Sequence, residues 1–262
     1  MSENETTTAE ETAVTTLARF EVPSRLEKIE DPNDPNHLTF VAEPFENGYG
    51  HTLGNSLRRV LLGSLEGAAI TSVRIAGAQH EFSSLPGVVE DVTEIVLNLK
   101  KVKFKHHGKE PRLLSLRVHK QGVVTAADIA DDTTYQVVNP DQIICTLDQD
   151  TMFECEFQVR VGRGFATGDE NKVPDMPIGV IPIDSIFSPV TRVKYSVQNT
   201  RVGQMTDYDK LTLEVWTDGR ISPADAMLQA SAILRHHLDV FVNYDDNQVN
   251  FEAVSYTHLR AH

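Results

Sequence analysis

A glycine-rich turn runs into a helix in the segment Gly48-Tyr-Gly-His-Thr-Leu-Gly-Asn-Ser-Leu-Arg-Arg-Val-Leu-Leu62. Its apolar residues recur at the i, i+4, i+7 and i+8 spacing of a buried helical stripe, namely Leu53, Leu57, Val60 and Leu61. Arg58 and Arg59 lie on the flank of that stripe. An arginine beside an apolar face can be held by packing and can direct its planar guanidinium at a carboxylate on another chain. The segment is therefore typical of a helix used in protein assembly, and nothing in it resembles a catalytic site.

The acidic balance of the chain argues against a protein that binds nucleic acid extensively. The 262 residues include 24 Lys and Arg against 38 Asp and Glu, which gives a formal net charge of −14. Proteins that bind phosphate backbones usually show the opposite balance. With 40% hydrophobic residues, the chain can bury a substantial core in one or two domains. No run of 18 apolar residues and no signal-peptide pattern occurs, so we expect a cytoplasmic protein with no membrane partner.

Apolar residues alternate, or recur at helical spacing, along most of the chain. Residues 152–161 form the clearest strand, because Phe153, Cys155 and Phe157 alternate with polar and charged residues. A second long helix is predicted at 223–242, where Ser222 and Asp225 can form a capping-box variant. We predict further strands at 19–29, 38–43, 71–76, 112–120, 135–138, 192–198 and 211–217, the first helix at 50–65, a helical stripe at 88–99 and a long loop at 162–182.

The cysteines and histidines do not indicate a metal or catalytic site. Cys145 and Cys155 lie in strand-like segments without metal-ligand spacing, which favours buried thiols over a disulfide or a zinc site. His51 could act as a general base, but no Ser, Cys or carboxylate partner is recognisable near it in sequence, so a capping or packing role is favoured. We therefore expect no catalytic residue, no metal and no cofactor bound by this chain.

The first segment closely resembles the signature of the bacterial RNA polymerase alpha subunit family. Further landmarks resembling that family follow in the family's order, between about residues 37 and 246. They are Gly87-Val-Val-Glu-Asp-Val92, Leu97-Asn-Leu-Lys100, Gly162-Arg-Gly164, Asp184-Ser-Ile-Phe-Ser-Pro-Val190, Arg201-Val-Gly-Gln-Met-Thr-Asp-Tyr-Asp-Lys-Leu211 and Gly219-Arg-Ile-Ser-Pro223.

The resemblance implies an α+β fold with a discontinuous dimerisation domain. That domain comprises residues 19–66 and 191–246, with two long amphipathic helices packed on an antiparallel sheet, and residues 67–190 form an inserted β-rich second domain. Residues 1–18 are acidic and lack an apolar period, which predicts a disordered leader. We also expect residues 247–262 to lack fixed structure, as a linker remnant followed by a non-native tail, Ser255–His262.

The resemblance also implies the partners of the chain. An alpha homodimer binds the beta and beta-prime subunits to nucleate the core enzyme for transcription, and omega and sigma join the assembled polymerase. The nucleotidyltransferase chemistry belongs to that complex and not to the alpha chain. In the family, promoter DNA and activators are contacted through a carboxy-terminal domain, and the sequence given stops where the linker to such a domain would follow.

Individual interface residues follow from the match to the family's motifs. Arg59 matches an arginine implicated in holding beta, Leu62 a position linked to beta-prime, and Lys100 a candidate beta contact. By position alone, Arg59 fits a solvated helix flank, Leu62 a core residue and Lys100 a solvated strand edge. The candidate dimer contacts are Leu53, Leu57, Leu61, Leu234, Leu238 and Phe241.

Two other functions stay open at this point. The first is an independent enzyme that uses His51 with an acidic partner, although no nucleophile, metal or phosphate motif accompanies the histidine. The second is a dimeric adaptor unrelated to transcription. Co-purification with beta and beta-prime separates that adaptor from a polymerase scaffold.

Overall fold

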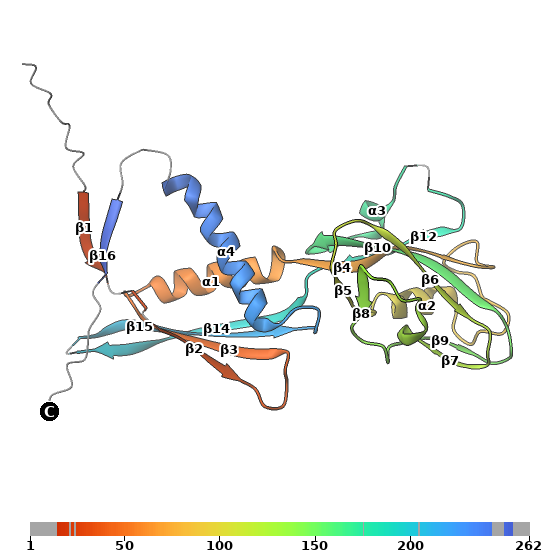
Figure 1. Ribbon diagram of the computed structural model, residues 1–262, viewed down its shortest axis with the longest axis horizontal. Helices are drawn as coiled ribbons and strands as arrows, with labels where there is room; N and C mark the ends of the chain where they lie inside the picture. The colour runs from red at the N-terminus through yellow and green to blue at the C-terminus, as the bar shows by residue number, and fades with distance from the viewer. Residues whose placement is uncertain are drawn as a thin grey trace, which may run out of the picture.

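Apart from the paired strands β1 (Thr15–Phe20) and β16 (Val249–Ala253), the described chain forms two groups of strands and helices that meet at a narrow joint (Figure 1). The structure is a computed structural model that describes residues 15–20, 22–23, 25–174, 176–203, 205–242 and 249–253. The fold is mixed α+β, with many strands and few helices. None of the helices within these ranges is long and apolar enough to cross a membrane.

One group, which we call the four-stranded region, consists of an antiparallel sheet with the order β14-β15-β3-β2 and two helices. The helix α1 packs on β14 and β15 and also contacts α4 (Figure 1). A hydrophobic cluster under the two helices includes Phe40, Leu61, Leu213 and Val215. The elements are β2 (Arg25–Glu30), β3 (His37–Phe45), α1 (Tyr49–Gly63), β14 (Val190–Val202), β15 (Met205–Thr217) and α4 (Pro223–Val242).

Glycines allow α1 to lie close against the sheet. A Cβ atom on Gly50 would approach Val197 to 2.9 Å, and one on Gly54 would approach the ring of Tyr195 to 2.7 Å, so neither position has room for a side chain. The buried carboxylate of Asp209 accepts hydrogen bonds from the backbone N–H groups of Gly48 at 2.8 Å and Gly50 at 3.1 Å. A carboxylate at a helix N-terminus is favourable because it faces the positive end of the helix dipole. The glycine-rich motif therefore fixes the start of α1 on β15.

The start of α4 agrees with the capping prediction. The hydroxyl of Ser222 accepts a hydrogen bond from the backbone N–H of Asp225 at 3.1 Å and donates one to the Asp225 carboxylate at 2.7 Å. The buried residues of α4 all lie in its first half, namely Pro223, Ala226, Met227 and Ala230. The first half of the helix is packed into the core of the four-stranded region, and Ile233 at the start of the second half packs against it partly buried.

The other group, which we call the six-stranded region, comprises the elements from β4 to β13. Its main sheet has the order β6-β10-β4-β5-β8, and β12 also pairs with β4, on the edge of β4 that faces away from β10. The strands of this sheet are β4 (Glu66–Ile75), β5 (Phe104–His106), β6 (Arg112–Val118), β8 (Tyr135–Val137), β10 (Phe153–Arg163) and β12 (Val180–Pro182). Around it lie α2 (Val92–Leu99), β7 (Gly122–Thr125), β9 (Ile143–Leu147), β11 (Phe165–Ala166), α3 (Gly168–Asn171), β13 (Ser185–Ile186) and the short helix Ala126–Asp128.

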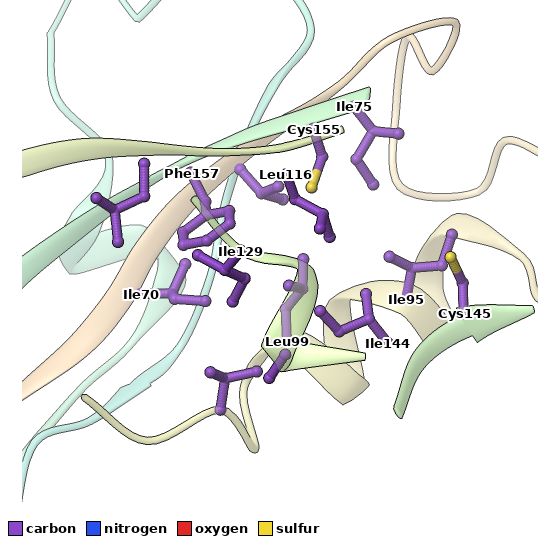
Figure 2. Close-up of a cluster of buried hydrophobic side chains, with 14 of the residues drawn as sticks. Ile70, Ile75, Ile95, Leu99, Leu116, Ile129, Ile144, Cys145, Cys155 and Phe157 are labelled. Atoms are coloured by element: carbon purple, nitrogen blue, oxygen red, sulfur yellow. The ribbon is translucent and has the colours of Figure 1, made fainter. Parts of the chain in front are cut away.

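The core of the six-stranded region is closed. Phe157 from β10, Leu99 from α2 and Ile144 from β9 are each fully buried and lie in one cluster (Figure 2). The apolar side of α2 faces this cluster, and the Asn98 side chain donates a hydrogen bond to the Ile144 carbonyl at 3.1 Å. The side chains of β10 alternate between buried and half-buried, as the sequence pattern predicted.

Two parts of the fold differ from the sequence prediction. Residues 162–182 were predicted to be a loop but contain the end of β10, β11, α3 and β12. Residues 15–18 and 249–253, predicted to lack fixed structure, lie in β1 (Thr15–Phe20) and β16 (Val249–Ala253), which pair in parallel. Both strands are rich in β-branched and aromatic residues, which favour extended backbone. The rest of the predicted leader and tail, residues 1–14, 247–248 and 254–262, lies outside the described residues.

Candidate protein interaction surfaces

The second half of α4 presents apolar side chains to solvent. Leu238 is 52% exposed and Phe241 is 71% exposed, and Val240 and Val242 beside them are exposed as well. Large apolar side chains that gather on one surface usually mark a site of interaction with another protein. Leu238 and Phe241 are two of the candidate dimer contacts, and both are available for such an interaction.

The other candidate dimer contacts are less available. Leu61 is fully buried in the core of the four-stranded region, so its side chain cannot reach a second chain in this conformation. Sequence periodicity placed it on the apolar face of α1 without showing that the chain's own sheet covers that face. Leu57 is partly buried against the same core, and Leu53 and Leu234 are half-buried.

Two arginines of α1 face solvent. Arg58 and Arg59 are both exposed, and the side chain of neither makes a hydrogen bond or an ion pair with the residues that the structure describes. Leu62, three residues after Arg59, is partly buried against the hydrophobic cluster. Arg59 therefore lies on a firmly packed helix with its guanidinium group available to a carboxylate of another protein.

Lys100, the third candidate contact with a polymerase subunit, has a partner within the chain. Its ammonium lies 3.0 Å from the carboxylate of Asp184, and the other oxygen of that carboxylate accepts a hydrogen bond from the backbone N–H of Gly168 at 2.7 Å. These bonds, the one from Gly168 first, hold the pKa of Asp184 below its ordinary value of 3.8. The motif that starts at Asp184 is recognisable in the sequence, but its contact with Lys100 is not, because the two residues are far apart in sequence.

The histidine and the cysteines lie where packing explains them. The ring of His51 lies edge-on to Tyr195, with 6.2 Å between the ring centroids, which agrees with the packing role favoured from the sequence. Cys145 and Cys155 are free and fully buried, as predicted. Burial raises the pKa of Cys145 to about 12 and raises the pKa of Cys155 as well. Within the described ranges, no three His, Cys, Asp or Glu side chains are grouped to hold a metal ion.

Comparisons with known proteins place these features in one family. The family described as "RNA polymerase Rpb3/RpoA insert domain" matches residues 73–188. The DNA-directed RNA polymerase subunit alpha of Symbiobacterium thermophilum is 52% identical over 230 residues, which cover 88% of this chain and 73% of the relative. The subunit alpha of Desulfitobacterium hafniense is 51% identical over the same shares of the two chains. That of Moorella thermoacetica is 53% identical over 209 residues, or 80% of this chain and 67% of the relative.

Proposed function

This chain belongs to the family of bacterial DNA-directed RNA polymerase alpha subunits, and we propose that it forms the homodimeric scaffold on which the beta and beta-prime subunits assemble. Membership of that family makes it a subunit of a transcription enzyme. In this proposal its contribution is assembly, and nucleotide transfer is carried out by other subunits of the complex, which omega and sigma also join.

The exposed apolar end of α4 carries the dimer part of the proposal. Phe241 and Leu238 would be covered by the same surface of a second copy, in an isologous contact with two-fold symmetry. Burying these side chains removes apolar area from water, which is the main driving force of association. The helix α1 contacts α4 within the chain, and in this proposal the half-buried Leu53 and Leu57 of α1 would contribute to the contact with the second copy. Leu61 is not part of this contact.

The division into two domains follows the two hydrophobic cores. One cluster includes Leu65 and Val190, and the other begins at Ala68 and ends at Ile183. This separation supports a dimerisation domain of residues 19–66 and 191–246 and an inserted domain of residues 67–190, except that Val190 packs in the core of the dimerisation domain. The beta and beta-prime contacts would then lie on both domains, with Arg59 and Leu62 on the first and Lys100 on the second.

Arg59 is the residue that we assign to the beta subunit. Its exposure on a packed helix allows a bidentate pair with a carboxylate of beta. If that pair is desolvated, Arg59→Ala leaves a buried charge without its partner, at a cost of about 3–5 kcal/mol. This cost corresponds to about a hundred- to several-thousand-fold weaker binding. Arg59→Lys should restore only part of the affinity, because an ammonium cannot reproduce the guanidinium fork.

The experiment is capture of purified beta by immobilised wild-type and variant alpha dimers, with the dimer mass measured by light scattering. Arg58→Ala is the matched control, because it removes another exposed arginine from the preceding position of the same helix. Undiminished capture by Arg59→Ala would overturn the assignment. Loss of the dimer in Arg59→Ala would show that Arg59 supports the folded dimer itself and not the contact with beta.

A further inference from the structure

The two regions are joined where two passages of the chain cross. The first passage leads from α1 into β4, and the second leads from β13 into β14. A Cβ atom on Gly67 would lie 2.0 Å from the carbonyl oxygen of Phe187, so the two backbones touch at this crossing. Substitution of Gly67 by any other residue would force the passages apart, since the atom in the way belongs to the backbone.

A buried arginine binds both passages from the turn between β15 and α4. The guanidinium of Arg220 donates to the carbonyl of Ala68 at 2.9 Å in the first passage. It also donates to the carbonyls of Ile186 at 3.3 Å and Ser188 at 2.6 Å in the second. Arg220 is only 6% exposed. Arg220 follows β15, a strand of the four-stranded sheet. These bonds therefore connect the four-stranded region to both segments of the chain that lead into and out of the six-stranded region.

The charge of Arg220 is balanced at the same place. The carboxylate of Asp218 lies 2.7 Å from Nη2 of the guanidinium and also accepts from its Nε at 2.9 Å. Lys103, from the six-stranded region, lies 3.7 Å from the same carboxylate. Burial, followed by the nearby charge of Arg220, lowers the pKa of Lys103. A buried arginine that is fully hydrogen-bonded and paired has one favoured geometry, because each broken bond would leave a buried polar group unsatisfied.

We propose that Arg220 is a positioning residue that fixes the angle between the four-stranded and six-stranded regions. Its hydrogen bonds to the carbonyls of Ala68, Ile186 and Ser188 are made across the joint. The consequence of this fixed angle for polymerase assembly rests on the proposed function. A rigid joint keeps Arg59 on one region and the Lys100–Asp184 pair on the other at a constant separation, so that polymerase subunits can engage both surfaces.

The test is a distance measurement across the joint in the full chain. Spin labels on Lys28→Cys, in β2, and Lys120→Cys, beyond β6, place one label on an exposed position of each region. The native thiols of Cys145 and Cys155 are fully buried and do not compete for the label. Labelled protein is diluted into an excess of unlabelled protein, so that only distances within one chain are measured.

We expect a narrow distance distribution in the wild type and a several-fold broader one in Arg220→Ala. The matched control is Arg117→Ala, which removes an arginine from an exposed pair with Glu154 on the six-stranded sheet and should leave the width unchanged. Arg220→Lys retains the charge beside Asp218 but cannot reach all three carbonyls, so its width should be intermediate. Circular dichroism and Trp216 fluorescence verify that each variant is folded.

An Arg220→Ala distribution as narrow as that of the wild type would overturn the proposal. If Arg220→Ala does not fold, Arg220→Lys decides, and a wild-type width in that variant is equally contradictory. Assembly with beta and beta-prime separates this proposal from the previous one. Broadened distances with undiminished assembly would support the positioning role of Arg220 while contradicting simultaneous engagement of both surfaces.

Discussion

The helices of the two regions differ in how completely the chain covers them. In the six-stranded region, Val92, Ile95 and Leu99 of α2 are fully buried. In the four-stranded region, α4 is buried at Ala226 and Ala230, but Leu238 and Phe241 in its last two turns are exposed. The core-facing side of α2 is fully covered by the chain, whereas the end of α4 keeps apolar side chains exposed to solvent. The exposed end of α4 is the part of this comparison that the proposed dimer would cover.

The largest expected effect tests the closed core. Phe157→Ala should lower the free energy of unfolding of the six-stranded region by about 3–5 kcal/mol, because it removes a fully buried ring and leaves a cavity. Urea unfolding is followed by circular dichroism for the whole chain and by fluorescence of Trp216, the single tryptophan, for the four-stranded region. The circular dichroism transition should move much more than the fluorescence transition. Equal shifts would mean that the two regions unfold together and that their cores are not independent.

The next effect distinguishes the buried Leu61 from the exposed Leu238 in the four-stranded region. Leu61→Ala should cost about 2–5 kcal/mol at every protein concentration, because Leu61 lies inside the chain's own core. Leu238→Ala should cost less, and its effect should increase with protein concentration, since the lost contact lies between copies. Thermal unfolding of both variants over a range of concentrations makes the comparison. A concentration-dependent effect of Leu61→Ala would show that Leu61 contributes to the dimer interface.

The smallest effect concerns the ion pair of the six-stranded region. The folded-state pKa of Asp184 lies below its ordinary value of 3.8, so its contribution to stability is present above that value and is lost as the pH falls through the folded-state pKa. Because the pair is partly exposed, Lys100→Ala should cost only about 0–1 kcal/mol at neutral pH. The difference in stability between wild type and Asp184→Asn, measured by urea unfolding from pH 7 downward, should shrink below that ordinary value. A difference that stays constant through this range would contradict the lowered pKa.

Local patterns in the sequence predicted the elements whose burial alternates regularly. The strand at β10 was recognised because one of its faces is buried in the core, and the start of α4 was recognised from Ser222 and Asp225. These features depend on neighbouring residues only. The strands β1 and β16 were missed because the pairing of 15–20 with 249–253 joins segments far apart in sequence.

The sequence predicted less of the candidate site, for a physical reason. Periodicity shows that α1 and α4 have apolar faces, but it does not show which side chains the same chain covers, so Leu61 and Phe241 could not be distinguished. Likewise, the motif that contains Arg220 was recognised, but its contacts with Ala68 and Ser188 depend on the crossing of distant segments. A residue's availability to a partner is a property of the folded surface.

The measurement that tests the scaffold proposal most directly is the mass of the chain in solution, with and without the apolar end of α4. The wild type should sediment with twice the mass of one chain, and Phe241→Glu should sediment as a single chain at the same concentration, because a carboxylate would be desolvated without a partner. The control is Ile178→Glu, which introduces the same charge at a residue of the six-stranded region that is 98% exposed, and it should remain a dimer. A dimer mass for Phe241→Glu would contradict the account.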